Sequence, residues 1–122
     1  MTNTQLKKWI QKLGQAWEER DPEAIPQLFA ENFKYYETPF EKPYTKKTDL
    51  IRLWQDVPKS QKDIKFEFEI ISINKNMGIA HWKASFIRIK NHTKACLDGI
   101  FLIKLDNQGL CTEFRQWWVT KE

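Results

Sequence analysis

The sequence predicts an α+β domain in which helices come first and a bent antiparallel sheet follows. Three stretches before residue 58 place apolar residues at helical spacing, whereas the stretches after residue 64 alternate like strands. The last part, Lys94 to Val119, holds two runs of branched and aromatic residues around an Asp-Asn-Gln-Gly turn, which is typical of a β-hairpin. Residues 1–122 should therefore form one domain, with three helices packed on the concave face of a strongly curved antiparallel sheet.

Residues 4 to 20 are predicted to form the first helix, because one stripe of apolar side chains repeats every three or four positions. This stripe consists of Leu6, Trp9, Ile10, Leu13 and Trp17. Asp21 precedes a proline and should cap a short second helix that holds Ile25, Leu28 and Phe29.

A brief strand over Phe33, Tyr35 and Tyr36 should end before Pro39. The third helix then carries Leu50, Ile51, Leu53, Trp54 and Val57. Thr45 or Thr48 could cap this helix, and Pro58 should stop it.

The first long strand, residues 64 to 73, alternates strictly up to Ile70, after which Ile71 and Ile73 take the other face. We therefore expect a bulge or sharp bend at that point. Residues 78 to 90 place Trp82 and Phe86 on one face and should change phase in the same way at Ile87.

In the final hairpin we expect Leu105 to lie opposite Leu110, and Phe101 opposite Phe114. One face of the hairpin is then almost purely apolar, and the other mixes charges with Trp117, which a lone domain would not normally leave in water. The apolar face should cover the core, and the second face is a candidate contact surface for another subunit.

The charge distribution argues against a nucleic-acid partner. The chain has 122 residues and a net charge of +4, and its 20 basic residues are scattered among 16 acidic ones without any nucleic-acid-binding motif. Neither histidine, His81 nor His92, has a partner at metal-ligand spacing, so no metal and no cofactor are implied.

The cysteines and the hydropathy pattern favour a cytoplasmic protein. Cys96 and Cys111 lie far from opposite each other on the hairpin, which makes a disulfide between them geometrically poor. The N-terminus lacks the apolar core of a signal peptide, and no apolar run is long enough to cross a membrane.

The chain resembles, over essentially its whole length, the SnoaL-like members of the nuclear transport factor 2-like superfamily, whose fold is an α+β cone, and two segments, residues 19–40 and 97–118, carry the resemblance. The first segment, ERDPEAIPQLFAENFKYYETPF, resembles their D-x-x-x-(I/L)-x-x-L-F-A segment with its following strand. The second, LDGIFLIKLDNQGLCTEFRQWW, resembles their last two strands. A departure is Lys46-Lys47, where family members often have Gly-Arg.

The resemblance implies a pocket between the helices and the concave face, and a homodimer formed through the convex face. The side chains expected in the pocket are Trp17, Trp54, Trp82, Phe86, Phe101, Phe114, Gln116 and Trp118. Those expected at the dimer interface are Asp98, Arg115 and Trp117, with an ion pair between Asp98 and Arg115.

The catalytic residues of related enzymes are largely missing. At the positions that steroid isomerases of this superfamily use, the chain has Leu13, Thr38 and Phe101, none of which can exchange a proton with a substrate. Where scytalone-dehydratase-like enzymes carry a Tyr-Asp pair, it has Trp17 and Glu18. The remaining candidates for catalysis are Glu18 as a pocket acid, and Glu37 as a base with Tyr36 as its donor. The alternative for each, which the sequence favours, is a solvated or structural side chain.

Three functions stay open from the sequence. The favoured one is binding of a hydrophobic small molecule in an aromatic-lined pocket. The second is general acid-base catalysis by an isomerase, dehydratase or cyclase on a cyclic apolar substrate. The third is a protein-interaction or dimerisation domain in which the aromatic side chains simply fill the cone.

Overall fold

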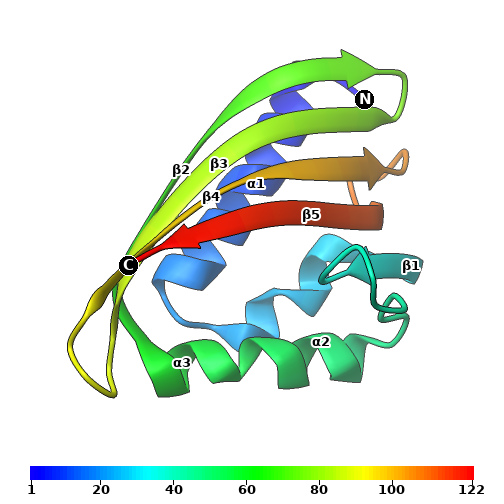
Figure 1. Ribbon diagram of the computed structural model, residues 1–122. Helices are drawn as coiled ribbons and strands as arrows, with labels where there is room; N and C mark the ends of the chain where they lie inside the picture. The colour runs from blue at the N-terminus through cyan, green and yellow to red at the C-terminus, as the bar shows by residue number, and fades with distance from the viewer.

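The computed structural model describes all 122 residues and shows one open, five-stranded sheet that curves around the helices (Figure 1). The order along the chain is α1 (Asn3–Glu18), β1 (Phe29–Tyr36), α2 (Lys47–Trp54), α3 (Asp56–Ser60), β2 (Gln61–Asn74), β3 (Met77–Arg88), β4 (Lys94–Leu105) and β5 (Cys111–Lys121). The strands lie in the order β1-β5-β4-β3-β2, antiparallel except that β1 runs parallel to β5. The predicted α+β architecture is confirmed.

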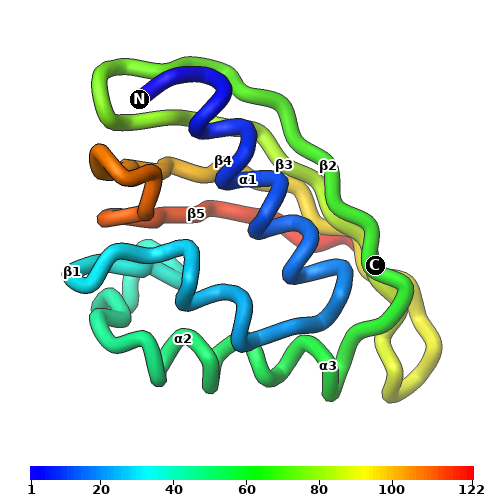
Figure 2. The backbone as a smooth tube through the Cα atoms, turned by 180° about the vertical axis from the view of Figure 1, so that it is seen from behind, coloured from blue at the N-terminus to red at the C-terminus, as the bar shows by residue number.

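Helix α1 crosses the concave face of the sheet, as Figure 2 shows. It begins with a capping box in which the Thr2 side chain accepts from the Gln5 backbone N–H and the Gln5 side chain accepts from Thr2. Its whole predicted apolar stripe is buried. Gly14 lets the helix approach β2 closely, because a Cβ there would overlap the ring of Phe66.

The predicted second helix is wrong. The chain forms two 3₁₀ turns, Pro22–Ala24 and Pro26–Leu28, and Phe29 already begins β1. Pro26 is the physical reason, since it has no N–H to donate in a continuing α-helix.

The predicted end of the third helix is also wrong, because α2 ends at Trp54 and Pro58 lies inside the short helix α3. Proline is tolerated there because the first turn of a helix needs no intrahelical N–H donor. The N-cap of α2 is Lys46, without a side-chain hydrogen bond, so neither predicted threonine cap forms.

Bulges produce part of the sheet's curvature. The register between β2 and β3 shifts between Ile70 and Ser72, where the sequence predicted it, and the extra residue Ile71 is exposed. The phase change predicted in β3 does not occur, since Arg88 lies on the same side as Phe86. The second irregularity is in β2 instead, between Lys62 and Lys65.

The final hairpin has a register different from the predicted one but the same two faces. Leu105 lies opposite Cys111, and Phe101 lies opposite Gln116, because the turn is one residue longer than expected and a bulge adds another residue at Thr112. The carboxylate of Asp106 holds this turn by accepting from the backbone N–H groups of Gln108 and Leu110. The turn and the bulge each shift the strand pairing by one residue. Because side chains alternate between faces, the combined shift of two residues leaves the same side chains facing the core.

The core lies between the concave sheet face and the helices, and no polar or charged residue is fully buried in it. Cys96 is exposed and Cys111 is buried, both as free thiols. None of the helices combines the length and the apolar character that crossing a bilayer requires.

Candidate functional site

A cleft of about 450 Å³ opens between the concave side of the sheet and helices α2 and α3. Twelve of its 18 lining residues are hydrophobic, and all eight side chains predicted for the pocket lie along it. The other lining residues are Leu13, Tyr35, Glu37, Leu53, Asp56, Val57, Gln61, Arg88, Leu97 and Thr120. Its volume is within the range of small-molecule sites, about 300–1,000 Å³.

Aromatic contacts and hydrogen bonds fix the walls of the cleft. Trp17 meets Trp54 edge-on at 5.8 Å between ring centroids, and Trp82 stacks on Phe101 at 5.0 Å. The Trp17 indole donates to the Gln61 side chain at 2.8 Å, and the Trp54 indole donates to the Tyr35 hydroxyl at 3.2 Å. Side chains held in this way need little reordering when a ligand enters.

Glu37 forms the polar corner of the cleft. It follows the last residue of β1, and its Oε2 accepts a hydrogen bond of 3.1 Å from the Gln116 amide on β5. Burial raises the pKa of Glu37 to about 7, with a further rise from the nearby charge of Glu41 and partial compensation by hydrogen bonds from Gln116 and Tyr35. Near neutral pH this carboxyl group is therefore present in both protonation states, which suits a general acid or base.

Tyr35, which the sequence arguments did not single out, faces the cleft beside Glu37. It is fully buried, and burial, followed by the charge of Glu37, raises the pKa of its hydroxyl well above the usual value. Residues 35 and 37 of an extended strand share one face, so strict alternation was the signal that pairs Glu37 with Tyr35.

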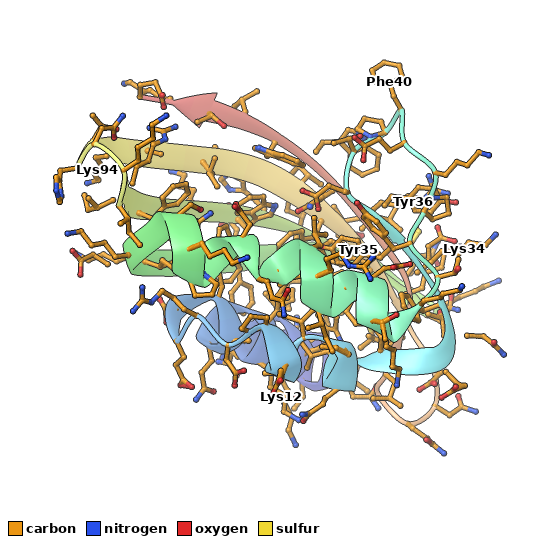
Figure 3. All side chains as sticks on the ribbon, turned by 90° about the horizontal axis from the view of Figure 1, so that it is seen from below. Lys12, Lys34, Tyr35, Tyr36, Phe40 and Lys94 are labelled. Carbon is orange, nitrogen blue, oxygen red and sulfur yellow. The ribbon has the colours of Figure 1, made fainter.

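The predicted partner of Glu37, Tyr36, points the other way. The guanidinium of Arg115 lies 3.9 Å from the centroid of its ring on the convex side. After β1 the chain continues into a loop with Phe40 at its tip, which Figure 3 shows projecting away from the body and which is 99% exposed.

Glu18 also lies outside the cleft. Its Oε2 accepts a hydrogen bond of 3.0 Å from the backbone N–H of Phe66, so the carboxylate covers the outer edge of β2. The groove beside it, between α1 and β2, is larger, at about 660 Å³, but is more open and lined mostly by polar side chains. The 450 Å³ cleft fits an apolar ligand better.

The three residues predicted for a dimer interface share the convex face, but their pairing differs from the prediction. Arg115 Nε donates to Glu113 at 2.9 Å, and Asp98 Oδ1 lies 2.7 Å from Nε2 of His81. The ion pair between Asp98 and Arg115 is wrong, because the bulge places Val119 opposite Asp98. Trp117 is 42% exposed.

His81 lies between two carboxylates on the convex face, which the sequence arguments missed. Besides Asp98, its Nδ1 lies 3.2 Å from Glu69 on β2. These two hydrogen bonds, first that with Asp98 and then that with Glu69, raise the pKa of His81. No group of three or more His, Cys, Asp or Glu side chains has the arrangement of a metal site.

Comparisons with known proteins identify the domain type. A family model described as "SnoaL-like domain" matches residues 10–114. A conserved protein from Planctomyces limnophilus DSM 3776 has a TM-score of 0.77 at 11% identity, over 97% of this chain and 96% of that one. SalBIII, an epoxide hydrolase/cyclase-like enzyme with a role in pyran ring formation in the polyether salinomycin, has a TM-score of 0.80 at 15% identity, over 98% and 95%. No curated protein sequence matches the chain.

Proposed function

The chain belongs to the SnoaL-like domain family, within the nuclear transport factor 2-like superfamily, and we propose that it binds an apolar, ring-containing small molecule in the 450 Å³ cleft. One observation carries the proposal: the cleft is walled by aromatic side chains and has a partly buried carboxyl group, Glu37, at one corner. Such a cleft favours a ligand that buries a large apolar surface and presents one polar group in a defined direction.

Tryptophan fluorescence tests this binding directly. Four of the six tryptophans, Trp17, Trp54, Trp82 and Trp118, line the cleft, so a bound ring compound should change their emission. A panel of fused-ring hydrocarbons, ketones and ethers should include at least one compound with saturable binding. The absence of any response across the panel would contradict the proposal.

A matched pair of variants locates the binding. Leu97→Trp fills part of the cleft and should abolish binding, whereas Val119→Trp makes a comparable addition on the exposed, convex side of the same hairpin and should preserve it. Because the added indoles alter the fluorescence baseline, calorimetry is the appropriate measurement. Equal loss in both variants would place the binding outside the cleft.

A second candidate function is general acid-base catalysis by Glu37, which the rise of its pKa to about 7 favours. SalBIII, which shares the fold, is described as an epoxide hydrolase/cyclase-like enzyme. We propose hydroxy-epoxides as the first substrates to test, because ring closure moves a proton from the attacking hydroxyl to the opened epoxide oxygen. Glu37→Gln should remove turnover while preserving affinity, since it keeps the shape and loses the proton exchange. Unchanged turnover would exclude this role for Glu37.

We also propose that two copies of the chain pair through their convex faces. The convex face exposes Trp117 and Val119, and it carries both acidic and basic side chains, so it can complement itself across a two-fold axis. Light scattering should give twice the mass of one chain for the wild type and the mass of one chain for Trp117→Lys. A monomeric wild type at tens of micromolar protein would refute the dimer.

A further inference from the structure

One buried hydrogen-bond donor, on a residue that lines the cleft, has no partner in the protein. Trp82 lies in the middle of β3 with 2% of its surface exposed, and its Nε1 is the only buried side-chain nitrogen or oxygen without a hydrogen bond. Three other indoles in the interior are satisfied: Trp9 by the Leu28 carbonyl, Trp17 by Gln61 and Trp54 by Tyr35. Buried indole N–H groups normally find an acceptor, so this exception requires an explanation.

The packing around Trp82 prevents the indole from turning toward a protein acceptor. Its ring stacks on Phe101 at an interplanar angle of 16° and meets Trp17 edge-on at 5.7 Å. Gly99 provides the space beneath it, because a Cβ on Gly99 would lie 2.9 Å from Trp82 Cε2, the carbon bonded to Nε1. The edge of the indole that carries Nε1 therefore lies against the inner face of β4, and Trp82 is one of the residues that line the cleft.

We propose that the ligand of the cleft carries an uncharged acceptor, a ketone or ether oxygen, that takes the hydrogen bond of the Trp82 indole. This inference rests on the proposed function, because it concerns the molecule that the cleft holds. An uncharged oxygen fits better than an anion, since Trp82 supplies a single neutral donor among apolar rings. The one basic side chain that lines the cleft, Arg88, is already paired with Glu122 at 2.7 Å.

The register of the sheet separates this donor from the Glu37 corner. Trp82 pairs with Gly99 and Gly99 with Trp118, whereas the Glu37 partner Gln116 lies on β5 opposite Phe101. Strands β3 and β5 have β4 between them, which corresponds to about 10 Å at the usual strand spacing. The ligand class is therefore an apolar fused-ring compound with an acceptor oxygen at one end and a group that faces Glu37 at the other.

A double-difference experiment tests the hydrogen bond with three bicyclic probes of nearly equal shape. 1-Tetralone has a ketone oxygen, chroman has an ether oxygen and tetralin has neither. Their dissociation constants are measured by calorimetry for the wild type, Trp82→Phe and the convex-face control Trp117→Phe. Trp82→Phe keeps an aromatic ring and removes the N–H. The dissociation constant of tetralin divided by that of 1-tetralone should fall about fivefold in Trp82→Phe, because the variant no longer donates a hydrogen bond to the ketone. The same ratio should stay unchanged in Trp117→Phe.

The indole N–H resonance gives a second readout that uses only the wild-type protein. In a ¹⁵N-labelled wild-type sample the Trp82 Hε1 signal, assigned through its nuclear Overhauser contacts with the neighbouring Phe101 ring, should move downfield with 1-tetralone and chroman and much less with tetralin. This measurement decides the question even if Trp82→Phe does not fold.

The outcomes separate the two proposals. If the probes bind but the ratio and the indole resonance are the same with and without the oxygen, the acceptor inference is overturned and the proposed function stands. If neither these probes nor any other ring compound binds, both are overturned. If Trp82→Phe loses the preference for 1-tetralone over tetralin and Trp117→Phe keeps it, both proposals are supported.

Discussion

Glu37→Gln tests the electrostatics of the cleft without requiring a ligand. The substitution keeps the size of the side chain and leaves a carbonyl oxygen that can accept from the Gln116 amide, which lies 3.1 Å from Glu37 Oε2. It removes the ionisable group whose pKa burial raises from 4.5 to about 7. The two proteins should therefore differ in how their stability depends on pH.

The magnitude follows from the linkage between pKa and folding. A rise from 4.5 to about 7 corresponds to about 3.4 kcal/mol, at about 1.36 kcal/mol for each pKa unit. Because Glu37 is not fully buried, we reduce this figure to about 2 kcal/mol. Between pH 4.5 and pH 7 the folded state binds more protons at Glu37 than the unfolded state. The free energy of unfolding of the wild type should therefore fall with rising pH in that window, and Glu37→Gln should lack this fall.

Urea unfolding at several pH values from 4.5 to 8 gives the required free energies. From pH 4.5 to pH 7, the free energy of unfolding of Glu37→Gln should rise by about 2 kcal/mol relative to that of the wild type. Glu31→Gln, which replaces an exposed carboxylate on the same strand, should follow the wild type throughout. Glu41→Gln should move the wild-type transition to lower pH, because the charge of Glu41 raises the pKa of Glu37. Parallel curves for Glu37→Gln and the wild type would refute the raised pKa.

Two further predictions concern the sheet. Asp98→Asn should lower the pKa of His81, because the hydrogen bond with Asp98 is the main cause of its rise. An NMR titration of His81 measures this pKa, and an unchanged value would contradict that cause. Because the pKa of His81 is raised in the folded state, the wild type should exceed Asp98→Asn in stability more at pH 5 than at pH 8. Gly99→Ala should destabilise the fold by about 1–3 kcal/mol in urea unfolding, because the new Cβ overlaps the Trp117 backbone carbonyl; a change below about 0.5 kcal/mol would show that β5 can move away.

The architecture could be predicted because faces of strands follow from alternation alone. Phe101, Gln116 and Trp118 were placed on the concave face and lie along the cleft, even though the hairpin register was wrong. Turn length and the bulge at Thr112 were not readable, since both depend on how the Asp106 carboxylate and the neighbouring strands arrange the backbone. An error of two residues keeps every side chain on its face, whereas an error of one would have exchanged the faces.

The chemistry of the site could be predicted only in part. Glu37 was named but paired with Tyr36, although alternation puts Tyr35 on the same side as Glu37. The raised pKa of Glu37 depends on burial and on the charge of Glu41, which comes from a loop whose path the sequence does not specify. The unpaired indole of Trp82 likewise results from tertiary packing on Phe101 and Gly99 rather than from any local pattern.

The two unfavourable features of the interior occur along the same cleft, as the proposed binding function would require. Glu37 is held in a position where burial disfavours its charged form, and Trp82 Nε1 has no acceptor. Elsewhere the core contains no fully buried polar residue, so its packing shows no general tolerance of such costs. Phe at position 82 and an uncharged residue at position 37 would remove both costs, so packing alone gives no reason for Trp82 and Glu37. A ligand that accepts from the indole at one end and meets the carboxyl group at the other gives both side chains a role that packing alone does not.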